Sequence, residues 1–513
     1  MTIGTHDTAS APTTRRWWAL TVLCLSVLLV VVDNTIVNVA LPTLSAQLHA
    51  STSGLQWLVD AYSLVFAGLL LVGGGLGDRF GRKPMLQLGL VLFAATSLWA
   101  ASSSTTNGLI AARAGMGAAA ALVYPATLAL LSTIFTDRRE KAMAIGIWSG
   151  VSGLAVAIGP VSGGVLLQHF AWHAIFLVNI PLVVLALVAG KRLLPNSRDD
   201  APGRFDVVGA ALSVGAIGLL VWTIIEAPGR GWTSGATVGG FLSAAIVLAA
   251  FIGWEQRRTD PLLDVALFRN PRFSAASAAI AMAFFGLFGF IFLITQFFQA
   301  VRGYDTLRAG LATLPFAVVV GVLSPVAIVL MKRFGTTLAV GAGLLLMSAG
   351  FVLVANTDVD AAYWGPVVVA MVLMAAGLAL VTGPATDAIM SALPAARVGA
   401  GSAVNDTTRE VGGALGVAVI GSVMNSIYGA GVGGRFAELG LPTEAVAAAK
   451  QSVMAALAVA RQLPAELGTP AVDAARHTFM DGLHAGSYAA AGATALTAVA
   501  VLVFLPRHDG GIE

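Results

Sequence analysis

Fourteen apolar segments, each about twenty residues long, constrain the fold of this chain of 513 residues more than any other feature. A helix needs about 20 apolar residues to cross the hydrocarbon core of a bilayer. Only 11 % of the residues are charged, whereas a soluble domain has about 25 %. The sequence therefore predicts an all-α polytopic membrane protein with spans near 17–40, 55–76, 85–104, 108–131, 143–168, 173–190, 206–226, 235–254, 273–298, 309–331, 338–355, 364–388, 403–426 and 485–506.

The positions of Lys and Arg test this topology independently. Alternate connecting segments, together with both termini, hold 20 of the 29 basic residues; the other connections hold 7, and Arg113 and Arg409 lie inside spans. Because cytoplasmic loops carry the excess of Lys and Arg, we expect both termini in the cytoplasm. One long segment, 427–484, lies on the opposite side. It predicts short amphipathic helices with breaks at Pro464 and Pro470, which either cover the outer vestibule or simply connect two spans.

Composition also excludes several classes of function. The net charge of +3 comes from the basic loops, and it indicates contact with anionic lipid rather than with nucleic acid. Cys24 is the single cysteine, so no intramolecular disulfide can form. The chain has no nucleotide-binding loop of the Gly-x-x-x-x-Gly-Lys-Ser/Thr type, and its histidines show no metal-binding spacing. We expect no enzyme activity, no cofactor and no metal. The first apolar run is too long for a cleavable signal peptide.

Three charged side chains lie inside the first four predicted spans, where insertion scales put the cost of a charge at roughly 2.5–3.5 kcal/mol. Asp33 is in the first span, Asp60 is about five residues inside the second, and Arg113 is about five residues inside the fourth. The predicted topology places them in one layer of the outer half, where Arg113 can pair with an acid. Such residues predict a substrate or proton site. For Asp60 the alternative is a wet vestibule without a role.

Residues 74–83 read Gly-Gly-Leu-Gly-Asp-Arg-Phe-Gly-Arg-Lys in the basic loop after the second span. Gly81 permits a tight turn, and Asp78 can interact with a neighbouring helix end or with a nearby basic side chain. We predict a charge latch that breaks and re-forms as helices rock, made of Gly74, Asp78, Arg79, Gly81, Arg82 and Lys83.

The fifth span contains Gly-Pro-Val-Ser-Gly-Gly at 159–164. Pro160 removes a backbone hydrogen bond and bends the helix, while Gly159, Gly163 and Gly164 let another helix approach closely. The alternative is a packing motif with no bearing on the direction of transport.

These motifs resemble those of the major facilitator superfamily, and in particular of its fourteen-helix drug:proton antiporters of the QacA/EmrB type. Residues 74–83 are similar to the signature loop of the superfamily, 33–42 to the first-helix motif of the antiporters, and 159–164 to a motif of exporters. Arg113 and Pro125 resemble the fourth-helix motif, although Met116 stands where a glutamine is usual.

The resemblance implies a fold of two six-helix bundles plus two inserted linker helices. It implies a monomeric, proton-coupled antiporter in a bacterial cytoplasmic membrane, which exports hydrophobic, cationic drugs by alternating access and meets drug, protons and lipids as partners. The expected organisation is a cytoplasmic tail 1–16, a first bundle 17–190, a linker 191–272, a second bundle 273–506 with the loop 427–484, and a tail 507–513.

The resemblance also assigns roles to acidic residues of two spans. Asp406 and Glu410 match acidic positions of the thirteenth helix of the family and share a helix face because they are four residues apart. An inner-mouth salt-bridge cluster with Arg409 is the alternative. The residues implied for proton coupling are Asp33, Arg113, Asp406 and Glu410. Those implied for substrate binding are Asp33, Asp60, Tyr62, Tyr124 and Glu410, since aromatic rings can stack on a flat cation.

Weaker candidates are Asp387 and Glu226. Three other functions stay open: a proton-coupled importer of a nutrient, an exporter of an endogenous metabolite or lipid, and a membrane enzyme or redox pump. The fourteen spans and the Gly-Pro motif argue against import, and no pair of haem-binding histidines supports a redox pump. Accumulation of a defined nutrient in an uptake assay would favour the importer.

Overall fold

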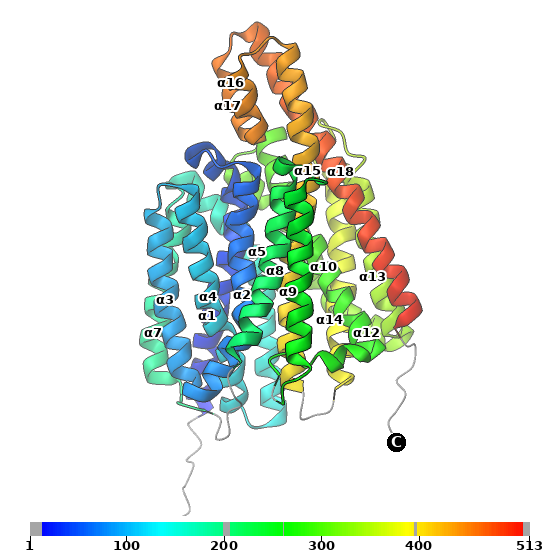
Figure 1. Cartoon of the computed structure of the whole chain (residues 1–513). Coiled ribbons are helices and arrows are strands. Elements are labelled where there is room, and N and C mark those ends of the chain that lie inside the picture. The colour runs from blue at the N-terminus through cyan, green and yellow to red at the C-terminus, as the bar shows by residue number, and fades with distance from the viewer. Residues whose placement is uncertain (1–12, 199–205, 260, 394–397, 506–513) are drawn as a thin grey trace, which may run out of the picture.

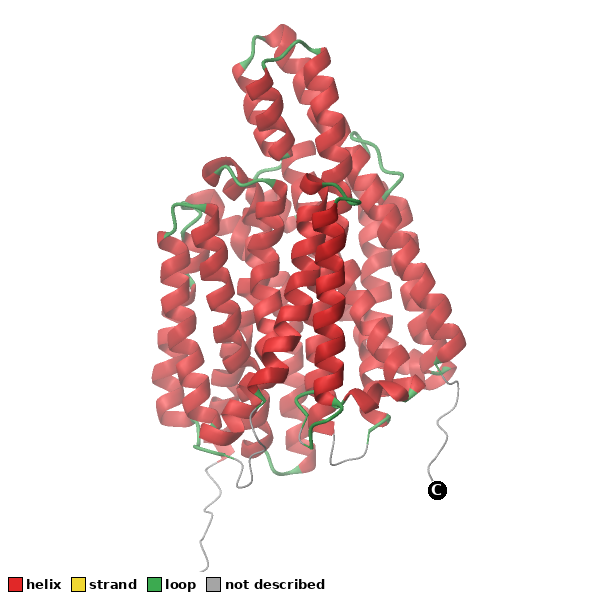
Figure 2. Cartoon of the chain, viewed as in Figure 1, coloured by secondary structure: helices red, strands yellow, loops and turns green. Residues whose placement is uncertain are grey.

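The computed structural model describes residues 13–198, 206–259, 261–393 and 398–505, and every regular element in these ranges is a helix (Figure 2). The predicted tail 507–513, and all but the last four residues of the tail 1–16, lie outside them. Thirteen of the described helices are long and apolar enough to cross a membrane, or fourteen if the bent α5 is counted as one span. The fourteen predicted spans are thereby confirmed.

The first six spans are formed by α1–α7, in which α6 and α7 together make one span. Two further helices, α8 and α9, follow. The bounds of these elements are α1 Thr13–Leu48, α2 Thr52–Phe80, α3 Arg82–Ser102, α4 Thr106–Ile134, α5 Arg138–His169, α6 Ala174–Leu177, α7 Asn179–Leu193, α8 Val207–Arg230 and α9 Gly235–Glu255.

The last six spans lie beside the first six, and α8 and α9 lie in front of both groups in Figure 1. The bounds of the remaining elements are η1 Val265–Arg269, α10 Pro271–Gln296, η2 Phe297–Val301, α11 Thr306–Leu311, α12 Leu314–Phe334, α13 Thr336–Val354, η3 Tyr363–Val367, α14 Val368–Ser391, α15 Val398–Glu438, α16 Thr443–Gln451, α17 Val453–Gln462 and α18 Ala465–Phe504. This is the predicted arrangement of two bundles and a linker pair.

The segment 427–484 stands out beyond the spans as a helical projection (Figure 1). It consists of the extended ends of α15 and α18 with α16 and α17 between them, and we call it the cap. The end of the molecule that carries it is the cap end, and the opposite end is the termini end. Pro464 directly precedes α18, as predicted, but Pro470 lies inside that helix. The prediction of a break there is wrong because the carbonyl that loses its partner, that of Glu466, belongs to an exposed residue that water can reach.

The first helix of the first bundle departs from its predicted span, and the fifth has the predicted bend. The first continues eight residues past the predicted end at Ala40, so Pro42 lies inside α1. Asp33 is therefore 15 residues from the end of its helix instead of about seven. In α5 the two parts, 139–156 and 158–169, meet at an angle of 42°. The bend lies one turn before Pro160, whose ring nitrogen cannot donate to the carbonyl of Val156.

Glycines bring the helices of the first bundle into backbone contact. A Cβ on Gly73 of α2 would lie 1.9 Å from the carbonyl oxygen of Ala121 in α4. A Cβ on Gly117 of α4 would lie 2.3 Å from the carbonyl oxygen of Tyr62 in α2. Only glycine fits at such crossings. The close approach holds the buried middle of α4 against α2, next to α1.

The linker helix α8 packs against both bundles at the seam between α2 and α15. An apolar cluster joins the three helices there and consists of Leu64 of α2, Val221, Ile224 and Ile225 of α8, and Ala414 and Ala418 of α15. The second linker helix, α9, packs on α8. The linker pair therefore covers one of the two seams between the bundles.

Candidate functional site

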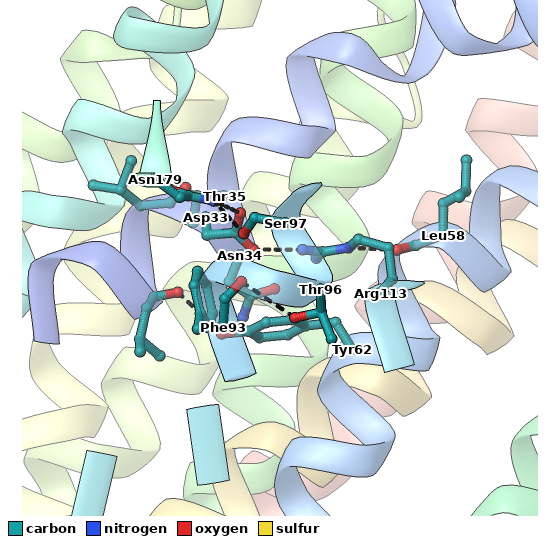
Figure 3. Close-up of polar contacts among 12 residues, drawn as sticks. Asp33, Asn34, Thr35, Leu58, Tyr62, Phe93, Thr96, Ser97, Arg113 and Asn179 are labelled. Carbon is teal, nitrogen blue, oxygen red and sulfur yellow. Dashed lines mark hydrogen bonds and ion pairs between the residues drawn. The ribbon is translucent and has the colours of Figure 1, made fainter. Parts of the chain in front are cut away.

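A buried ion pair lies at the centre of the first bundle (Figure 3). Nη1 of Arg113 in α4 lies 2.5 Å from Oδ2 of Asp33 in α1, and both side chains are completely buried. The second carboxylate oxygen of Asp33 accepts a hydrogen bond of 2.8 Å from Nδ2 of Asn179 in α7. The same amide donates to the hydroxyl of Ser97 in α3 at 3.2 Å. The Asp33 carboxylate is thus contacted directly from α4 and α7, and Ser97 of α3 is joined to it through Asn179.

The guanidinium group of Arg113 is fixed by further contacts. Its Nε donates to the carbonyl oxygen of Leu58 in α2 at 3.1 Å, and its Cζ lies 4.4 Å from the centre of the Tyr62 ring. The Tyr62 hydroxyl donates to the carbonyl oxygen of Val30 in α1 at 3.1 Å. Nη2 of Arg113 has no hydrogen-bond partner. Tyr62, predicted to bind substrate, therefore packs on the arginine and is completely buried in this conformation.

Asp60 is a second buried acid in the same bundle, and it has no partner. Its side chain is 0 % exposed, and neither carboxylate oxygen accepts a hydrogen bond. The structure pairs Arg113 with Asp33 and not with Asp60, and it does not place Asp60 in a water-filled vestibule. An isolated carboxylate in apolar surroundings is costly, so Asp60 needs a proton or a cation from outside the chain.

A row of aromatic rings runs from Tyr62 towards the termini end. The ring centres are 5.9 Å apart from Tyr62 to Phe66, 5.8 Å from Phe66 to Tyr124, and 5.3 Å from Tyr124 to Trp148. Tyr124 is half-buried and lies within electrostatic range of Asp406 and Glu410 of α15. The structure therefore brings these predicted residues together from opposite bundles.

The two acids of α15 differ in their surroundings. Asp406 is 3.9 Å from Nη1 of Arg409, whose Nη2 donates to the hydroxyl of Thr386 at 3.2 Å. Asp406 thus belongs to a polar cluster that the salt-bridge interpretation describes. Glu410 is half-buried, and its Oε2 has no hydrogen-bond partner. Of the two, Glu410 is the more available to an incoming cation.

The predicted latch lies at the termini end. Arg82 pairs with Asp78 at 2.9 Å and donates to the hydroxyl of Thr133 in α4 at 2.8 Å. Lys83 donates to the carbonyl oxygens of Lys191 and Leu194, at 2.9 and 2.8 Å. Gly81 has a φ of +105°, which side chains rarely adopt, and so makes the turn from α2 to α3. These contacts hold α2, α3, α4 and α7 of the first bundle together.

Two other latch residues make fewer contacts. The Arg79 guanidinium lies 5.8 Å from the ring of Phe80, and a Cβ on Gly74 would lie 3.8 Å from Pro125 of α4. Of the weaker candidates, Glu226 pairs with Arg230 at 3.6 Å, and Asp387 is exposed.

The Gly-Pro motif of α5 lies where three helices meet. A Cβ on Gly159 or Gly163 would clash with Thr35 or Ile36 of α1, and one on Gly164 would lie 2.6 Å from the carbonyl oxygen of Thr306 in α11. The motif therefore packs helices, as both interpretations predict, and its bearing on the direction of transport stays a prediction. Because α11 belongs to the second bundle, it also joins the two bundles.

Hydrogen bonds between the bundles lie towards the cap end in the described part of the chain. The Ser45 hydroxyl of α1 lies 2.8 Å from that of Ser452 in the cap, and the Thr52 hydroxyl donates to the carbonyl oxygen of Gln451 at 3.0 Å. Gln299 donates to the carbonyl oxygen of Val39 at 2.8 Å. The cap thus contacts the first bundle as well as the second.

Asn179 and Ser97 were not singled out as site residues from the sequence. The signal for Asn179 is an amide inside an apolar run, two residues before Pro181. Ser97 has no comparable signal, because a single serine is common in membrane helices. As for metals, the described residues contain no group of three or more His, Cys, Asp or Glu that could hold one.

Comparison with known proteins gives consistent matches. The family model described as Major Facilitator Superfamily matches residues 23–417. The multidrug efflux pump LfrA of Mycolicibacterium smegmatis is 38 % identical over 94 % of this chain and 94 % of its own. The tetracenomycin C resistance and export protein of Streptomyces glaucescens is 35 % identical over 98 % and 94 %. The methyl viologen resistance protein SmvA of Salmonella typhimurium is 35 % identical over 91 % and 93 %.

Solved structures show the same fold. A bacterial homologue of the human lysosomal transporter Spinster, in an inward-facing and unoccupied conformation, superposes with a TM-score of 0.69. The alignment covers 98 % of this chain and 100 % of that chain, with 18 % identity.

We predict that Asp33→Asn lowers the free energy of unfolding by roughly 3–5 kcal/mol, because it leaves the Arg113 charge buried without its partner. The double variant Asp33→Asn/Arg113→Gln, which removes both charges, should recover most of the loss. Thermal unfolding in detergent measures both effects, with the exposed Asp358→Asn as the control. A double variant no more stable than Asp33→Asn would contradict the pairing.

Proposed function

Because the chain belongs to the Major Facilitator Superfamily, we propose that it is a drug:proton antiporter that exports hydrophobic cations across the bacterial cytoplasmic membrane. Relatives of nearly equal length are named as multidrug, antibiotic and methyl viologen resistance proteins, which supports export of drugs. The excess of Lys and Arg at the termini end supports a cytoplasmic location for that end. The predicted domain limits at 190, 272 and 506 are part of this proposal.

The observation that carries the proposal is the buried pair of Asp33 and Arg113. Two charges without water remain stable only while they stay paired and hydrogen-bonded. If the helices move and the pair separates, Asp33 must take up a proton or another cation. A conformational change is thereby linked to proton binding, as antiport requires. Asn179 keeps the carboxylate oriented towards the arginine while the pair is closed.

The proposed drug site lies between the bundles, towards the termini end from the ion pair. Tyr124 and Trp148 present aromatic rings from the first bundle, and such rings attract cations. Glu410 supplies a carboxylate from the second bundle. A drug bound between them contacts both bundles and can therefore respond to their relative motion. Asp60 is the additional acid that a cation meets on the way to the cap end.

Alternating access requires the two bundles to rock about the site. The contacts of the Gly-Pro motif and of the cap close the cap end in the conformation described. In the other state these contacts would open. The pair of Asp78 and Arg82 is the charge contact at the termini end that we propose to rearrange in that step.

The direct test is efflux of ethidium or a quaternary ammonium drug from energised vesicles. We expect export to stop when a protonophore with valinomycin collapses both the pH gradient and the membrane potential, because the chain has no nucleotide-binding loop. Vesicles with the protein omitted give the background. Export that survives the collapse would contradict proton coupling, and no drug movement in energised vesicles would contradict drug export.

A second prediction concerns the charge of the cargo. Asp60→Asn should weaken export of divalent cations most, of monovalent cations less and of neutral compounds least, because a carboxylate attracts charge strongly where water is scarce. Transport KM for a series of drugs of each charge measures the effect, and the exposed Asp358→Asn is the matched control. Equal losses for all three classes would assign Asp60 to structure or to proton coupling instead.

A further inference from the structure

Gln56 of α2 joins the two bundles through a single buried amide. Its Nε2 donates to the carbonyl oxygens of Val417 and Ala418 in α15, at 3.1 and 3.0 Å, and to the hydroxyl of Ser422 at 3.3 Å. Gln56 and Ser422 are both 0 % exposed. One side chain of the first bundle is therefore anchored on the backbone of a spanning helix of the second.

The opposite helix has a gap that fits this amide. A Cβ on Gly421 of α15 would lie 2.7 Å from Nε2 of Gln56, so the amide occupies the space that a larger residue would fill. Asp60 is four residues from Gln56 and so lies on the same face of α2, one turn nearer the termini end. The seam that the amide closes is thus beside the buried acid that lacks a partner.

The hydrogen bonds of the Gln56 amide to α15 can also break at low cost. Its oxygen, Oε1, is buried without a hydrogen-bond partner. A buried acceptor without a donor is unfavourable, and this offsets part of what the two N–H groups, shared among three acceptors, contribute. The carbonyl groups of Val417 and Ala418 lie within the long helix α15, so their oxygens keep their helical bonds when the amide leaves.

We propose that the contact of the Gln56 amide with α15 holds α2 and α15 together near the cap end. This contact sets the equilibrium between the conformation with a closed cap end and the one with an open cap end. This inference rests on the proposed alternating-access function. When the amide leaves α15, the seam opens beside Asp60, and water and protons reach that acid. The seam then controls when Asp60 exchanges a proton with the outer side.

The test uses two variants that disturb the same contact from opposite sides. Gln56→Met keeps the length of the side chain and removes the donor, and Gly421→Ala fills the gap in α15. Gly429→Ala is the matched control, because it lies in the same helix and its Cβ would meet no atom within 4 Å. Nitroxide labels at Ser104→Cys and Asp358→Cys, in a Cys24→Ser background, report the distance between the bundles at the cap end by double electron–electron resonance in nanodiscs.

We expect Gln56→Met and Gly421→Ala each to raise the population with a long label distance, relative to the population with a short one, roughly three- to tenfold. This is the change expected for loss of about one net hydrogen bond. Gly429→Ala should leave the ratio of the two populations unchanged. Distances in Gln56→Met equal to those of the control would overturn the proposal, whatever Gly421→Ala does. The measurement needs no drug and no proton gradient. Failure of drug export in vesicles would therefore overturn the proposed function, whereas the label distances would still test the role of Gln56.

Discussion

The pairing of Asp33 with Arg113 inside the hydrocarbon layer is the constraint around which the first bundle is built. Neither charge is stable there alone, so α1 and α4 must stay within hydrogen-bond distance of each other across the bundle. Leu58 of α2 and Asn179 of α7 supply the acceptor and the donor that complete the pair. Glycine contacts between α2 and α4 make this geometry possible, because they allow the backbones to touch. Contacts from four helices, α1, α2, α4 and α7, thus stabilise the two buried charges.

The contacts between the bundles are of a different kind. At the cap end they are single hydrogen bonds and glycine crossings: Gln56 on α15, Thr306 on Gly164, and Ser45 on Ser452. Apolar packing accompanies these polar contacts, because Leu64 of α2 lies in one buried cluster with Ala414 and Ala418 of α15. Within the first bundle the ion pair is buried and closed in the conformation described, and the proposed antiport requires it to separate in another. The seam therefore combines apolar packing with a small set of polar contacts, and rocking about a central site would require those polar contacts to break.

Much of this arrangement could be predicted from the sequence. The number of spans followed from apolar length, and Asp33 and Arg113 stood out because charges inside spans are rare. The partner of Arg113 could not be chosen, since the predicted spans put Asp33 and Asp60 at similar depths and only packing decides between them. The roles of Gln56 and Asn179 could not be predicted from the sequence either. A buried amide is neutral, so it does not interrupt an apolar run as a charge does. The length of α1 was underestimated because Pro42 looks like a helix end in a sequence, although proline is tolerated inside membrane helices.

The central claim is that Asp33 couples drug movement to proton movement. It can be tested most directly in liposomes that contain the purified protein and a pH-sensitive dye, with a drug gradient as the only driving force. The account predicts that drug flowing one way drives protons the other way, and that Asp33→Asn abolishes the proton flux while exchange of labelled for unlabelled drug continues. Proton flux of wild-type size in the Asp33→Asn protein would contradict it.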